Sequence, residues 1–105
     1  MITILLFDLP PQIYGCAIHD KKSGTYWVLI NPQQCDIQRR FVFGHELAHI
    51  GLQHHEISDY FMDHDSADYK RCEAEANRKA WDYYRKHKQA FYQLQNTGKV
   101  TIESS

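Results

Sequence analysis

Residues 43–55, FGHELAHIGLQHH, contain two histidines and a glutamate whose spacing suits metal binding and the activation of water. On a helix, His45 and His49 lie one turn apart on nearly the same face, so both imidazoles can reach one zinc ion at about 2.0–2.1 Å. Glu46 lies off that line and can reach a water beside the metal, which is the position of a general base. The motif therefore predicts His45 and His49 as metal ligands and Glu46 as a catalytic base.

The segment RCEAEANRKA, residues 71–80, offers a third ligand. A catalytic zinc ion takes three protein ligands and keeps a position open. Glu73 and Asn77 share a helix face, whereas Glu75 points elsewhere. We expect Glu73 to be the third ligand and Asn77 to orient a ligating histidine by hydrogen bonding, because ligating groups need such partners. Glu75 stays an alternative ligand, and if both fail the next candidates are His54, His64 and Asp65.

Other polar and aromatic residues are weaker candidates. His54 and His55 are expected to end the helix, where a positive charge suits the helix dipole. The isolated histidines are expected at the surface; they are His19, His64 and His87. Tyr60 and Tyr69 are candidates to donate to an oxyanion, although a packing role is favoured for each. The strand over residues 26–30 is a candidate sheet edge to which an extended peptide could add.

The elements that must position these residues follow from hydrophobic patterns and breakers. Strands are expected over residues 2–7, 15–19 and 25–31, the last two forming a hairpin. Asp36 is expected to cap a helix that runs to about His54, and its small residues Gly44, Ala48 and Gly51 would let another element approach closely. Ser66 or Asp68 is expected to cap a second helix of some 25 residues, which projects or breaks in its second half, with Gly98 as its stop.

These elements predict an α+β fold, in which a small antiparallel or mixed sheet of about three strands packs on the H-E-x-x-H helix and a second long helix. A chain of 105 residues suits a single domain. We expect one zincin-like domain over residues 1–105, with a core at about 9–80, a helical extension at 81–97 and a loose tail at 98–105.

Composition excludes several function classes. The net charge is −1 and the pI is about 6.6, so no basic field suggests direct nucleic-acid binding. The apolar run over residues 2–7 is too short for a signal peptide or a membrane span, so a cytoplasmic protein is expected. Three widely spaced cysteines suggest neither a disulfide framework nor a cysteine zinc site.

Three segments together resemble the ImmA/IrrE family of metallo-endopeptidases. They are LPPQIYG at 9–15, INPQQCDIQRRFVFGHELAHIGLQHH at 30–55 and EAEANRKA at 73–80, and the resemblance covers about residues 9–80. The sequence departs from the family pattern at Ala48, where glycine is usual, and over residues 79–84, after which no long C-terminal region follows. The chain thus resembles a short version of the family.

The resemblance implies a gluzincin-type site, with two histidines and a downstream glutamate on Zn²⁺ and Glu46 as base. It also implies a small sheet packed on the two helices. Members often cleave or inactivate a helix-turn-helix repressor of a mobile element, such as a phage, or of a stress response. The implied partner is therefore a protein or peptide substrate, with no membrane or direct nucleic-acid partner.

The leading hypothesis is a zinc metallo-endopeptidase, a hydrolase that cuts peptide bonds in a regulatory protein. The alternative is a non-catalytic zinc-containing module that regulates a DNA-binding partner by docking. A metal-free interaction domain is a third hypothesis. Glu46 favours the enzyme, because a purely structural zinc site needs no base beside the metal.

Overall fold

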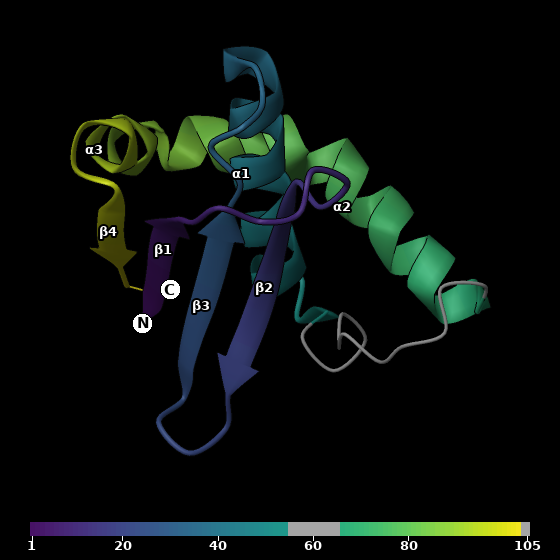
Figure 1. The fold of residues 1–105 in the computed structure, drawn as a ribbon. Helices are drawn as coiled ribbons and strands as arrows, with labels where there is room; N and C mark the ends of the chain where they lie inside the picture. Colours follow the sequence, from purple (N-terminus) through teal and green to yellow (C-terminus); the bar gives the residue numbers. More distant parts are fainter. Residues whose placement is uncertain (55–65, 104–105) are drawn as a thin grey trace.

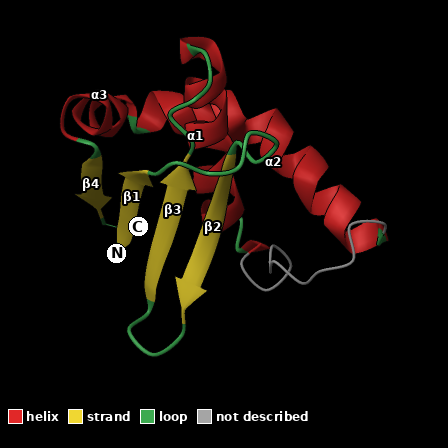
Figure 2. Ribbon diagram, viewed as in Figure 1, coloured by secondary structure: helices red, strands yellow, loops and turns green. Residues whose placement is uncertain are grey.

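A four-stranded mixed sheet carries three helices on one of its faces, in a computed structural model that describes residues 1–54 and 66–103 (Figures 1 and 2). The strands are β1 (Ile2–Leu6), β2 (Gly15–Asp20), β3 (Thr25–Ile30) and β4 (Lys99–Ile102). The helices are α1 (Asp36–Gly51), α2 (Ala67–Lys86) and α3 (Lys88–Thr97). The predicted α+β fold class, with a mixed sheet packed on helices, is confirmed.

The sheet order is β2-β3-β1-β4. Strands β2 and β3 form the predicted antiparallel hairpin, β1 pairs with β3 in parallel, and β4 pairs antiparallel with β1. The prediction that residues 26–30 form a sheet edge is wrong, because β3 lies between β2 and β1. Among the described strands, the two edges of the sheet are β2, the outer strand of the hairpin, and β4.

The prediction of a loose tail over 98–105 is wrong for β4. Val100 is buried, and Thr101 lies opposite Thr3 of β1 with their hydroxyl groups 3.4 Å apart. The hydrophobic core also includes Ile4 of β1 and Leu94 of α3, so it extends beyond residues 9–80 at both ends. A four-residue strand leaves too short a pattern in the sequence to be recognised. The division into core, extension and tail is therefore different from the one expected.

Helix α1 begins one residue earlier than predicted, because Cys35 and not Asp36 is its N-cap. Asp36 instead lies in the first turn, with its carboxylate 2.5 Å from Arg40 Nε and 3.6 Å from Arg39 Nη2. A carboxylate there still suits the positive end of the helix dipole. The buried side of α1 is the predicted apolar one and includes Phe43 and Leu47.

The second helix breaks, so one predicted helix becomes α2 and α3. Ser66 caps α2 as predicted, its hydroxyl accepting a hydrogen bond from Tyr69 N at 3.1 Å. At His87 the backbone leaves the helical region, and α3 turns back so that Phe91 and Leu94 are buried in the core. Gly98 ends α3 in the left-handed conformation, as its position predicted.

Asn31, directly after β3, fixes the loop that leads into β2. Its side chain is 1% exposed, donates to the carbonyl oxygens of Leu9 and Ile13 at 3.1 and 3.0 Å, and accepts from Gln33 N at 3.0 Å. The chain then enters β2 at Gly15, where a Cβ would lie 2.6 Å from Val42 of α1. This loop therefore sets how closely the backbone of β2 approaches α1.

Helices α1 and α2 touch at backbone level. A Cβ on Gly44 would overlap the carbonyl oxygen of Ala80, and both Ala48 and Ala76 are fully buried at the same interface. The predicted role of the small residues in α1 is thus confirmed. Among the described residues, no helix is both long and apolar enough to cross a membrane.

We expect Gly44→Ala to lower the free energy of unfolding by about 2 kcal/mol, because the new methyl group meets a backbone that cannot rotate away. Helix propensity alone would have the opposite effect on the free energy of unfolding, because it favours alanine over glycine by about 1 kcal/mol in a helix interior. Urea unfolding measured by circular dichroism checks it. Gly51→Ala is the matched control, since the atoms in its way belong to the Tyr83 side chain and can move. An equal loss in both variants would contradict the backbone contact.

Candidate metal centre

Three side chains from α1 and α2 converge where the helices face each other. One donor atom from each of His45, His49 and Glu73 lies within 4.8 Å of the other two. His45 Nε2 is 3.2 Å from Glu73 Oε2, His49 Nε2 is 2.9 Å from Glu73 Oε1, and the two Nε2 atoms are 3.0 Å apart. The structure thus brings together the three residues that the sequence suggested as ligands.

This donor set fits a divalent metal ion. Ligand atoms about 2.0–2.2 Å from a tetrahedral zinc ion lie roughly 3.3–3.6 Å from each other, which is a few tenths of an ångström more than the spacings seen here. Without a cation, the two Nε2 atoms and the carboxylate compete for too few protons. If both nitrogens donated to Glu73, the two N–H groups would lie 3.0 Å apart with no hydrogen bond between them. A cation between the three groups satisfies all of their lone pairs at once.

The charges of the three groups are strongly coupled. Burial alone would raise the pKa of Glu73, but hydrogen bonds from His45 and His49 and their charges hold that pKa far below its usual range. Burial alone would lower the pKa of His45, but the hydrogen bond to Glu73 and the charges of Glu46 and Glu73 outweigh it and raise that pKa. The arrangement therefore keeps Glu73 ionised, as a metal ligand must be.

Glu46 lies beside this group and does not join it. Its side chain is buried, and burial raises its pKa against the opposing charges of His45 and His49. A Cβ on Gly15 of β2 would lie 3.7 Å from Glu46 Cγ, so the carboxylate side chain lies between α1 and the start of β2. Glu46 is therefore placed near the three converging donors and near the edge strand.

Two further residues of α2 act on the same group from neighbouring turns. A polar contact with Asn77 contributes to the raised pKa of His45, but the buried Nδ1 atom of His45 has no hydrogen-bond partner among the described residues. The predicted orienting role of Asn77 thus stays a prediction. Burial and the charges of Glu73 and Glu46 raise the pKa of Tyr69, which places its hydroxyl within electrostatic reach of the centre.

His54 does not serve as the charged helix end that the sequence suggested. Helix α1 ends at Gly51, and His54 is 5% exposed with a pKa lowered by burial and by the charge of His49. Its Nδ1 atom lies 3.1 Å from Nδ1 of His49, and its Nε2 atom lies 3.4 Å from Glu75 Oε2. Glu75 therefore faces His54 and is not one of the three converging donors.

Several candidates lie elsewhere. His19 and His87 are half-buried and belong to no group of metal-binding side chains in the described part of the chain. The remaining candidates lie outside the described residues; they are His55, Tyr60, His64 and Asp65. Sequence reasoning treated His54 as a helix end because the turn that returns it to His49 depends on the backbone of Gln53, which has a positive φ of 61°.

A family model described as Peptidase_M78, the IrrE N-terminal-like domain, matches residues 3–83. The matched range contains the three converging donors, Glu46, the strands β2 and β3, and all of β1 except its first residue. No curated protein and no solved structure matches the chain.

We expect Glu73→Gln to reduce bound metal well below one ion per chain, because the amide brings no negative charge to the site. Glu75→Gln is the matched control two residues away, and it should retain one metal ion per chain at saturating metal concentration. Elemental analysis after gel filtration measures both. The opposite result, with metal lost only on changing Glu75, would identify Glu75 as the third ligand.

Proposed function

Because the chain belongs to the IrrE N-terminal-like domain family of M78 peptidases, we propose that it is a zinc-dependent endopeptidase whose centre is built from His45, His49 and Glu73. The observation that carries the proposal is the convergence of these three donor groups within 4.8 Å, with a buried carboxylate, Glu46, next to them. We also propose that residues 1–105 work as one catalytic domain, since α3 and β4 share the core with the rest.

The three ligands have distinct tasks. His45 and His49 would hold the metal through Nε2, and Glu73 would hold it through its carboxylate. Bound there, a zinc ion would act as a Lewis acid that polarises a peptide carbonyl. Glu73 also neutralises part of the metal charge, which His45 and His49 cannot do as neutral ligands.

Glu46 would act as the general base. A water attacking the carbonyl carbon gives one proton to a carboxylate oxygen of Glu46, and the same proton then passes to the nitrogen of the leaving amine as the C–N bond breaks. A base works best when its pKa approaches the working pH, and burial raises the pKa of Glu46 in that direction.

Tyr69 is the best-placed described residue to donate to the developing oxyanion. It lies one helical turn before Glu73, so the two side chains share a face of α2. Its raised pKa keeps the phenol protonated at neutral pH, and only a protonated phenol can donate.

The free edge of β2 is the surface on which an extended substrate would lie. Antiparallel addition of a peptide to an edge strand supplies main-chain hydrogen bonds without demanding a particular sequence. Gly15 brings this strand close to α1 beside Glu46, so a peptide on the edge would pass near the base. We propose that the substrate is a protein, such as a helix-turn-helix repressor, which the resemblance to ImmA/IrrE members supports.

We expect Glu46→Gln to abolish cleavage while metal content and fold are retained. The amide has nearly the same shape as the carboxylate but cannot accept the proton, and a general base typically contributes about 10²–10⁴-fold to rate. Incubation of the native and variant proteins with the candidate repressor, followed by gel electrophoresis and mass spectrometry, measures cleavage. Elemental analysis and circular dichroism provide the controls.

The same experiment separates the enzyme from the docking module. If Glu46→Gln relieves repression in cells as well as the native protein, proteolysis is not the mechanism and docking is. Binding of the repressor by native protein that never cuts it, with several divalent metals supplied, leads to the same conclusion.

For Tyr69→Phe we expect kcat to fall by about 10²-fold, as when one oxyanion donor is removed, with little change in KM. The phenyl ring keeps the packing, so metal content should not change. Steady-state kinetics on a fluorogenic peptide derived from the substrate measures both constants, with Tyr92→Phe on α3 as the matched control. An unchanged kcat would assign Tyr69 to packing alone.

A further inference from the structure

Behind the proposed metal ligands, a chain of polar groups runs from two buried histidines to partly exposed residues of α2. Nδ1 of His49 lies 3.1 Å from Nδ1 of His54, and Nε2 of His54 lies 3.4 Å from Oε2 of Glu75. The other carboxylate oxygen of Glu75 lies 3.6 Å from Nε of Arg71, one turn earlier on α2. His49 and His54 are both almost completely buried. The convergence of His45, His49 and Glu73 does not require any of these contacts.

The protons in this chain can be arranged in only one direction when His49 serves as a ligand. Its Nε2 atom faces Glu73 and His45, so Nε2 offers its lone pair there and the ring proton must be on Nδ1. That Nδ1–H then donates to Nδ1 of His54. The proton of neutral His54 is left on Nε2, which points to the Glu75 carboxylate.

We propose that His54 is a positioning residue for the metal centre, which accepts a hydrogen bond from His49 and is itself held by Glu75. The inference rests on the proposed metal site and goes beyond it, because neither the H-E-x-x-H motif nor the third ligand requires this residue. His54 fixes the ring orientation of His49 and keeps its proton on Nδ1. A ligating histidine oriented in this way is also more basic and binds its metal more strongly.

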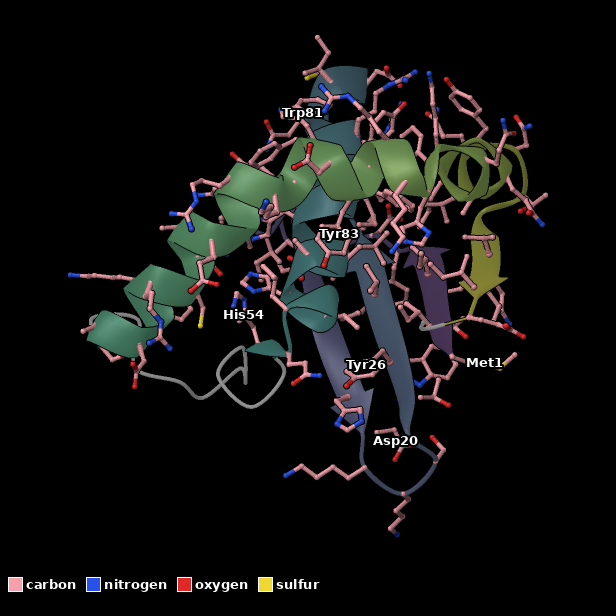
Figure 3. The ribbon with its side chains drawn as sticks, turned by 180° about the vertical axis from the view of Figure 1, so that it is seen from behind. Met1, Asp20, Tyr26, His54, Trp81 and Tyr83 are labelled. Carbon is pink, nitrogen blue, oxygen red and sulfur yellow. The ribbon has the colours of Figure 1, made fainter. Side chains whose placement is uncertain are left out.

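The fold builds this arrangement from local features of both helices. Leu52 N donates to Ala48 O at 2.9 Å and Gln53 N to Ile50 O at 3.0 Å, which closes the end of α1. The positive φ of Gln53 then turns the chain back, and His54 lies at the end of α1 on the side of the first half of α2 (Figure 3).

On α2, two carboxylates spaced two residues apart are directed to different histidines. Glu73 faces His45 and His49, whereas Glu75 faces His54. Arg71 lies one turn before Glu75, and its Nε atom is 3.6 Å from the carboxylate oxygen that does not face His54. Both carboxylates are about one-third exposed, so each keeps contact with solvent while its partner is buried.

The test compares His54→Phe with His54→Gln in the full chain. Phenylalanine keeps an aromatic ring but has no acceptor, whereas the glutamine side-chain oxygen can still accept from His49. We expect His54→Phe to weaken zinc binding by about 10–100-fold, and His54→Gln to restore most of the loss. Competition with a chromophoric chelator measures the affinity. His87→Phe is the control for the same substitution away from the site.

Each outcome decides a separate point. Equal zinc affinity in the native protein and His54→Phe overturns the positioning role, and equal losses in Phe and Gln variants assign His54 to packing. If metal-free His54→Phe does not fold by circular dichroism, Glu75→Leu tests the same chain from its exposed end, because leucine has no acceptor for the His54 Nε2–H. Unchanged affinity in that variant would overturn the proposal. A native protein that binds no zinc at all contradicts the proposed function instead.

A spectroscopic measurement adds a readout that packing alone would not change. Long-range ¹H–¹⁵N spectra of the histidine rings in the zinc-loaded native protein should show His49 protonated on Nδ1 and His54 protonated on Nε2. A His54 ring protonated on Nδ1 would reverse the proposed direction of the hydrogen bond and overturn the inference.

Discussion

The close contact between α1 and α2 at Gly44 and Ala80 is the constraint on which the candidate site depends. The ligands on α1 and the carboxylate of Glu73 on α2 reach one another only because the two backbones touch. A larger side chain at Gly44 would separate the helices by more than the few tenths of an ångström by which metal distances can vary. The sheet and α3 then support this pair from one side, and the break at His87 lets α3 do so without moving α2.

Electrostatics explain why polar groups other than the three converging donors lie at this site. The interface between the helices buries histidines and carboxylates in a place where unpaired polar groups are costly. Each titratable group is therefore matched to another across the interface: Glu73 to the ligand histidines, and Glu75 to His54. Glu46 is the exception, since it forms no ion pair with another described residue, and its burial raises its pKa. The polar groups of α2 thus serve as counter-charges for α1.

The sequence predicted what local patterns encode and missed what depends on distant contacts. The spacing of His45 and His49 predicted that both share one face of a helix, and the phase of the next helix favoured Glu73 over Glu75, because helical phase is a local property. The strand β4 was missed because four residues leave little pattern and gain their stability by pairing with β1, 98 residues away at Thr3 and Thr101. His54 was assigned to a charged helix end because the turn before it has a positive φ at Gln53, where no glycine in the sequence indicates such a turn.

The buried position of Glu46 favours a catalytic metal site over a purely structural one. A carboxylate that is 8% exposed and has a raised pKa reduces the stability of the fold relative to a neutral side chain of the same size. The three converging donors do not need it, since His45, His49 and Glu73 already form a set that could hold a metal. A purely structural site would therefore be more stable with an apolar residue at this position. The proposed function accounts for this cost, because a base beside the outer edge of β2 could transfer a proton to and from a peptide bound along that strand.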